Sequence, residues 1–175
     1  MPVTPFHYPV AYFVSKFNNK LNLPGLIVGS MVSDFEIPII LLFFRDRFLG
    51  DRLVLHSLLG VASFGTILAL LFTNLLYPKL VTLFFRVLRG DAMAKCRLSV
   101  NLVLSCLLGG ISHVLLDVIT HQYNPLFWPF QAAITPPICP YQMYLPTHIL
   151  LAILTLITLI VNRRSPWKKL LVGAS

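Results

Sequence analysis

Long apolar stretches, separated by short polar segments, organise the chain. Nearly uninterrupted apolar runs at residues 53–77, 98–120 and 147–161 predict three membrane-spanning helices. The first two have the length of about 20 residues that a bilayer core requires, and the third is somewhat shorter. We therefore expect an all-α, polytopic membrane helix bundle, with residues 1–175 forming one membrane-embedded domain.

A fourth apolar run, residues 23–44, differs because polar residues interrupt it. Asp34, Glu36 and Pro38 lie in its second half. Proline cannot donate the backbone hydrogen bond that continues a helix, and carboxylates are costly in hydrocarbon. The run is expected to form a broken or re-entrant pair of half-helices whose acids point into a polar cavity. A hairpin turn at the surface with two solvated acids is the alternative.

The remaining segments are expected to lie at the membrane surface. Residues 5–19 can form a short amphipathic helix, and residues 80–88 have the apolar and basic faces of an interfacial helix. Residues 45–52 form a short charged turn. Residues 121–146 are rich in proline and aromatic side chains, which is typical of an interfacial loop.

Composition supports the membrane assignment and excludes nucleic acid as a partner. The chain is 57% hydrophobic and 11% charged, whereas soluble domains contain about 25% charged residues. Its net charge of +8 comes from clusters between the apolar runs, not from one basic face. Residues 79–97 carry five Lys or Arg and residues 163–169 carry four, whereas residues 121–147 carry none. The first two segments are therefore expected in the cytoplasm and the third outside, although this orientation also places the three arginines of residues 45–52 outside.

The candidate chemistry lies in the few polar residues of the apolar runs. The chain has six acids and five histidines, and five of these residues lie in or at the ends of the runs: Asp34, Glu36, His56, His113 and Asp117. No Lys or Arg interrupts the same stretches. A carboxylate in hydrocarbon takes up a proton or needs a cation. A divalent metal would supply that charge, so the pattern predicts a metal site.

His113 and Asp117 carry the strongest local signal. They are four residues apart and share one face of a helix, so both can reach one metal, or one can orient the other. A His–Asp hydrogen bond between helices is the alternative. His56 lies near the start of its run and the pair lies near the end of theirs, so antiparallel packing places all three at one depth. His121 follows at a position that suits an outer-shell or ligand role.

Four motifs together resemble a prokaryotic membrane-protein family, number 4184 among the domains of unknown function. They are residues 1–9 (MPVTPFHYP), 23–36 (LPGLIVGSMVSDFE), 55–60 (LHSLLG) and 108–121 (LGGISHVLLDVITH). That family is distantly similar to inner-membrane metal-dependent hydrolases and to the zinc-dependent phospholipase C superfamily. Two positions depart from its pattern, since Ser33 and Gln122 stand where the family tends to have proline.

The resemblance implies a set of metal ligands. These are His7, Asp34, His56, His113 and Asp117, with Glu36 as a second acid of the Asp-x-Glu pair. His7 enters through the resemblance alone. Glu36 could bind the metal or act as the general base, and its spacing does not choose between the two.

These features lead to one functional hypothesis and two alternatives. The chain is expected to be a metal-dependent hydrolase of the prokaryotic inner (cytoplasmic) membrane, acting on a phosphoester of a lipid or of a lipid-linked or phosphorylated small molecule. Nitrogen and oxygen ligands suit zinc, and manganese or iron would also fit. The alternatives are a metal or proton-coupled transporter and a non-catalytic structural membrane protein.

Overall fold

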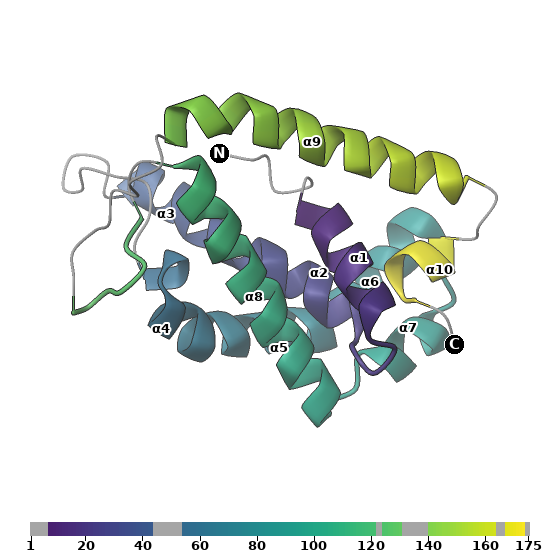
Figure 1. Cartoon of the computed structure of the whole chain (residues 1–175). Helices are drawn as coiled ribbons and strands as arrows, with labels where there is room; N and C mark the ends of the chain where they lie inside the picture. The colour runs from purple at the N-terminus through teal and green to yellow at the C-terminus, as the bar shows by residue number, and fades with distance from the viewer. Residues whose placement is uncertain (1–6, 44–53, 122–123, 131–139, 164–166, 174–175) are drawn as a thin grey trace.

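A computed structural model describes residues 7–43, 54–121, 124–130, 140–163 and 167–173 (Figure 1). Every regular element in these ranges is helical. Four stretches of helix within them are long and apolar enough to cross a membrane: Leu23–Ile40, Leu58–Leu75, Val100–Thr120 and Met143–Val161. The predicted all-α membrane helix bundle is confirmed. The charged turn predicted at residues 45–52 lies outside the described residues.

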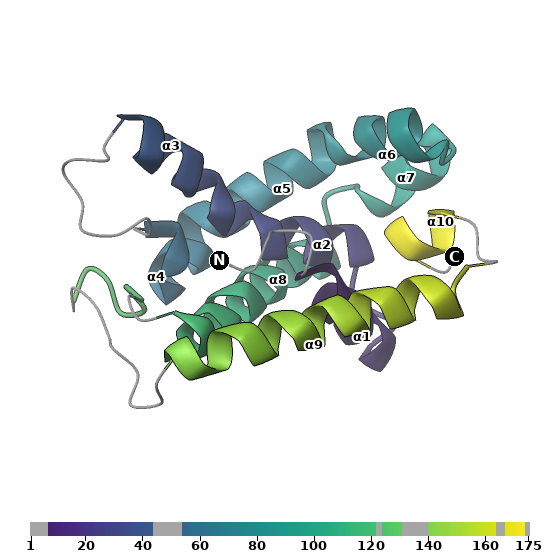
Figure 2. The same ribbon diagram turned by 90° about the horizontal axis from the view of Figure 1, so that it is seen from above.

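The helical elements follow one another along the chain. They are α1 (Tyr8–Phe17), α2 (Leu23–Val32), η2 (Ser33–Phe35), α3 (Glu36–Phe43), η3 (Val54–His56), α4 (Leu58–Gly60), η4 (Val61–Gly65), α5 (Thr66–Leu75), α6 (Tyr77–Phe85), α7 (Arg89–Lys95), α8 (Val100–Thr120), α9 (Pro140–Val161) and α10 (Trp167–Leu171). Seen from above, α5 and α6 lie on one side of α2 and α8, and α9 lies on the other (Figure 2).

Helices α2 and α8 run parallel and form the centre of the bundle. The Asn22 backbone N–H donates to Ser105 Oγ (2.7 Å) at one end, and His113 Nδ1 lies 2.7 Å from the Ser30 carbonyl oxygen further along. The close approach depends on glycine, because a Cβ atom at Gly29 would overlap the Cys106 carbonyl oxygen. Small residues that let two backbones approach closely are a common basis of helix association in membranes.

The apolar run of residues 23–44 is broken where the sequence predicts a break. Helix α2 ends at Val32, a 3-10 turn (η2) carries Asp34, and α3 resumes at Glu36. The tighter turn lies at the acids themselves, ahead of Pro38. The broken pair of half-helices is confirmed, and it positions both acids at a change of helical geometry.

Two predicted helix boundaries are wrong. The helix expected from residue 53 begins at Leu58, because Ser57 caps it by accepting the Gly60 N–H (2.9 Å). Helix α9 begins at Pro140, not at residue 147, and runs through Pro146. Proline at the first helical position costs no hydrogen bond. A single internal proline is tolerated in a membrane helix, because neighbouring helices, Ser or Thr side chains and local adjustments of the helix satisfy the backbone group that it frees.

Three short helices that follow or precede the spans lie together at one end of the molecule. Helices α6, α7 and α10 meet there (Figure 2). Lys168 Nζ lies 2.9 Å from Asp91 Oδ2, and the rings of Phe85 and Trp167 lie 5.0 Å apart. The α6 helix confirms helical structure in the segment predicted to be interfacial, whereas α10 is an element that the sequence pattern did not indicate.

Candidate metal centre

His113 and Asp117 face inward from the second half of α8. Both are almost fully buried, with 1% and 2% exposure, and His113 Nε2 lies 3.5 Å from Asp117 Oδ2. The four-residue spacing places them on one helix face, as the sequence predicts. The parallel packing of α2 against α8 then brings the Ser30 carbonyl to the other side of the His113 ring.

Asp34 and His56 complete the group from two short 3-10 turns. Asp34 Oδ1 lies 3.4 Å from His113 Nε2 and 3.7 Å from His56 Nε2. His56 Nε2 also lies 3.4 Å from Asp117 Oδ2. Asp34, His56, His113 and Asp117 are called the four-residue cluster below. The antiparallel packing of α5 and α8 therefore places His56, His113 and Asp117 at one depth, as predicted.

The distances within the cluster fit ligands around an ion better than they fit hydrogen bonds. N–H···O hydrogen bonds measure about 2.7–3.2 Å between heavy atoms, and the four N···O distances here are 3.4, 3.4, 3.5 and 3.7 Å. Ligands at about 2.0–2.2 Å from a tetrahedral zinc ion are separated by about 3.3–3.6 Å. Nε2 of His56 and Nε2 of His113 are buried without a hydrogen-bond partner among the described residues.

Contacts on the far side of both imidazoles fix their orientation. His56 Nδ1 lies 2.7 Å from Glu36 Oε1, and His113 Nδ1 lies 2.7 Å from the Ser30 carbonyl oxygen. Because a carboxylate and a carbonyl only accept, each Nδ1 donates its proton, and Nε2 of a neutral imidazole then presents a lone pair to the cluster. Histidine ligands of metals are usually held in this way.

Glu36 thus contacts the cluster through His56. Its second oxygen, Oε2, accepts the Leu55 backbone N–H at 2.8 Å. The spacing left Glu36 as either a ligand or a general base. The contacts favour a third role, which is to orient His56 and to hold the η3 turn against α3. No pattern in the sequence indicates the Ser30 and Leu55 contacts, since each depends on packing between distant segments.

His7 lies beside the cluster at the start of α1. Its ring stacks on that of His113 with centroids 4.2 Å apart, and His7, His113 and Asp117 each offer a ligand atom within 4.8 Å of the others. Burial, with a smaller effect of nearby His113, lowers the pKa of His7 to about 4. A neutral imidazole is the form that binds a metal. The structure therefore brings His7 to the group, although only the resemblance singled it out.

His121 lies at the outer edge of the group. Its Nδ1 is 3.5 Å from Asp117 Oδ1 and 2.8 Å from Thr120 Oγ1. This position suits the outer-shell role considered for it. His148, in contrast, lies on α9 with its Nδ1 2.6 Å from the Tyr144 carbonyl oxygen. All of the predicted site residues thus lie together, while His148, which is not among them, contacts its own helix.

Comparison with known proteins identifies the family. A family model described as YdjM inner membrane protein matches residues 7–174. The chain belongs to the YdjM inner membrane protein family. No curated protein and no solved structure matches it. Membership, together with the four apolar helices, makes this YdjM-family chain an integral membrane protein. The match supports an inner-membrane protein family, which is the coarser part of the resemblance, but it does not name family 4184. These comparisons lend no support to the similarity with hydrolases or phospholipase C.

Proposed function

We propose that this YdjM-family protein is a membrane-embedded, metal-dependent hydrolase that acts on a phosphoester of a lipid or lipid-linked substrate. The observation that carries the proposal is the spacing of the four-residue cluster, whose N···O distances of 3.4–3.7 Å match the edges of a metal coordination shell. Two imidazoles and two carboxylates form a donor set that suits zinc, and manganese or iron would also fit.

The residues have distinct tasks in this proposal. Asp34, His56, His113 and Asp117 would hold a divalent ion, with His7 as a further nitrogen donor beside them. When bound, the ion would lower the pKa of a water molecule and polarise a phosphoryl oxygen. Glu36 positions His56, which makes it a positioning residue and not the base considered from its spacing.

Accessibility indicates where a substrate would enter. Asp34 is 9% exposed, whereas His56, His113 and Asp117 are 1–2% exposed. The cluster is therefore most open beside Asp34, at the break between α2 and α3. Asp117 lies about 5 Å of helix length from the end of α8, given a rise of 1.5 Å per residue. That depth is close to the level at which lipid headgroups meet the bilayer core.

The proposal is tested by turnover that depends on the metal. Purified protein in lipid nanodiscs, loaded with Zn²⁺, is incubated with phospholipids of several headgroups, and release of phosphate or headgroup is measured. We expect turnover that a chelator abolishes and Zn²⁺ restores, and a loss of about 100-fold or more in Asp117→Asn. His148→Ala is the matched control and should retain activity. Turnover that survives both chelation and Asp117→Asn would contradict the proposal.

A metal or proton-coupled transporter is the second candidate, favoured by the broken helix at the cluster. Discontinuous helices commonly place ion sites within membranes, and Asp34 lies on such a break. Vesicles containing the protein would separate the two functions. Metal-ion or proton flux that requires Asp34 and Asp117, without lipid turnover, would favour transport.

A further inference from the structure

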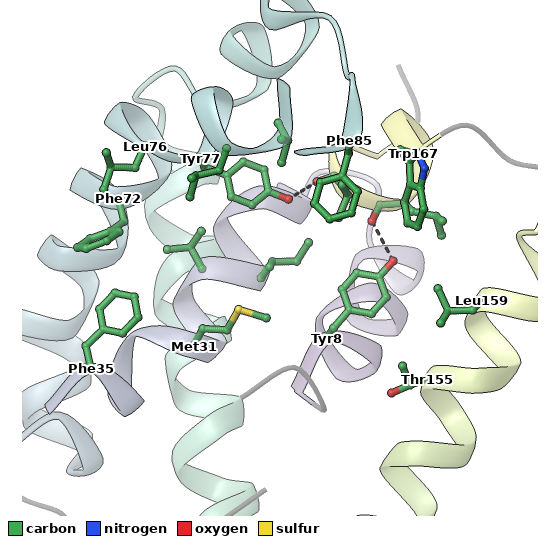
Figure 3. A pocket seen from close by; sticks show the side chains of 16 residues that line it. Tyr8, Met31, Phe35, Phe72, Leu76, Tyr77, Phe85, Thr155, Leu159 and Trp167 are labelled. Carbon is green, nitrogen blue, oxygen red and sulfur yellow. Dashed lines mark hydrogen bonds between the residues drawn. The ribbon is translucent and has the colours of Figure 1, made fainter. Parts of the chain in front are cut away.

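An apolar groove runs along the outside of α2. It encloses about 490 Å³ between α2, α5 and α6 on one side and α1, α9 and α10 on the other. Phe35 and Phe72 lie at one end, and Phe85 and Trp167 lie at the other (Figure 3). The volume lies within the range of small-molecule sites.

The groove offers hydrocarbon contacts and no free hydroxyl group. The Tyr8 hydroxyl donates to the Leu170 carbonyl oxygen (2.9 Å), and the Tyr77 hydroxyl donates to that of Leu171 (2.7 Å) (Figure 3). The Thr155 hydroxyl donates within α9 to the Leu151 carbonyl oxygen (2.7 Å). An apolar ligand would therefore leave none of these three donors unpaired.

Three residues that line the groove come directly after residues of the metal centre in the sequence. In three pairs of adjacent residues, the first residue belongs to the metal centre or orients it, and the second lines the groove. The pairs are His7–Tyr8, Ser30–Met31 and Asp34–Phe35. Neighbouring residues of a helix point about 100° apart. The centre and the groove thus occupy adjacent faces of the same turns of α1, α2 and η2.

The length and position of the groove suit a hydrocarbon chain. Ile27 and Phe35 both line the groove and are eight residues apart, a distance of about 12 Å along a helix. A hydrocarbon chain is narrower than a helix, whose diameter is about 10 Å. Seven of the sixteen lining residues belong to candidate membrane spans, so lipid reaches that part of the groove.

We propose that the groove binds one hydrocarbon chain of the lipid whose polar group is held at the metal centre. This inference rests on the proposed function and specifies its substrate class as a lipid with a long chain. Helix α9 forms one wall and lies at the outside of the bundle, with only 11% of its span buried. Met31 lies between the Phe35 end and Tyr8 (Figure 3), and its flexible thioether can adapt to an entering chain.

A photo-reactive lipid tests the binding directly. The protein is reconstituted with phosphatidylglycerol that carries a diazirine in one acyl chain, irradiated, and mapped by mass spectrometry. We expect crosslinks at groove residues such as Met31 and Phe72. Leu159→Trp narrows the groove from α9 and should weaken these crosslinks about tenfold, the effect of losing roughly two buried methylene contacts. Ile160→Trp is the matched control, because Ile160 is on the same helix, is 55% exposed and does not line the groove.

Turnover separates failure of the groove from failure of the proposed function. Leu159→Trp should lower turnover of long-chain phosphatidylglycerol about tenfold and leave a soluble short-chain analogue unaffected. Equal labelling of the groove and of the outer face of α9, with long-chain turnover unchanged in Leu159→Trp, would overturn the groove and leave the hydrolase standing. Labelling confined to the groove, without turnover of any phospholipid, would uphold chain binding and overturn the hydrolase.

Discussion

At the scale of single residues, the orientation of two imidazoles defines the centre. His56 and His113 each donate Nδ1–H outward, to Glu36 and to the Ser30 carbonyl oxygen, and each presents Nε2 to two carboxylates. In the alternative interpretation, no metal binds and protonated imidazoles form ion pairs with the carboxylates. The Nε2···O distances of 3.4–3.7 Å are longer than charge-assisted hydrogen bonds, which measure about 2.7–2.9 Å.

Glu36→Gln tests the positioning role of Glu36. The amide keeps the shape of the side chain but loses the charge that holds His56 Nδ1–H. We expect zinc affinity to fall about 10–100-fold, as is typical for such outer contacts. Competition with a chromophoric chelator measures the affinity. Asp91→Asn, at the ion pair with Lys168, is the control acid and should bind as the wild type does. An unchanged affinity in Glu36→Gln would show that Glu36 does not orient a ligand.

Asp34→Asn tests direct ligation by comparison with Glu36→Gln. A ligand contributes its own bond, whereas Glu36 contributes through His56, so we expect Asp34→Asn to lower zinc affinity more than Glu36→Gln does. The same chelator competition measures both variants side by side. The reverse order would move Glu36 into the coordination shell and Asp34 out of it.

At the scale of elements, the contact between α2 and α8 sets the register of the centre. Asn22 meets Ser105 at one end of the contact, and Ser30 meets His113 further along. Gly29 and Gly109 allow this approach, because a Cβ atom at either would overlap backbone of the other helix. The position of Asp34 relative to His113 therefore depends on glycines that do not touch the centre.

Gly29→Ala is expected to disturb both stability and the centre. The methyl group would force α2 and α8 apart, and overpacking of this kind costs about 1–3 kcal/mol. The melting temperature in detergent and the zinc affinity should fall together. Gly90→Ala is the matched control, because a Cβ atom at Gly90 meets nothing within 4 Å. Equal melting temperatures for the two variants would contradict the tight packing.

The elements also show which parts of the fold can be predicted from the sequence. The apolar runs predicted the spans, and the acids of the run at residues 23–44 predicted its break, because both follow from the cost of polar groups in hydrocarbon. The starts of α4 and α9 were misplaced because local capping by Ser57 and the tolerance of a membrane helix for Pro146 decide them. The residue types of the centre were predictable, whereas the contacts of Ser30 and Glu36 require the packing of segments far apart in sequence.

At the scale of the whole molecule, the charges predict an orientation. The end formed by α6, α7 and α10 carries basic residues, including Arg86, Arg89, Lys95 and Lys168. Cytoplasmic loops of membrane proteins carry such an excess. The four-residue cluster lies toward the other end of α8, and the proposed substrate would then come from the outer half of the bilayer.

Reporter fusions test this orientation. A reporter enzyme that is active only after export should be inactive when fused after residue 97 and active when fused after residue 126. A reporter that is active only in the cytoplasm should give the opposite pattern. Reversed activities would place the metal centre on the cytoplasmic side, and would leave its geometry unchanged.

The central claim is that the cluster binds a divalent ion, and the metal content of the purified protein tests it most directly. Wild-type protein and His148→Ala, exposed to Zn²⁺ and then dialysed, should retain about one ion or more per chain by mass spectrometry. The His113→Ala, Asp117→Ala double variant and the milder Asp117→Asn should lose most of it. Wild-type protein that retains no metal, or variants that retain as much as the wild type, would contradict the claim.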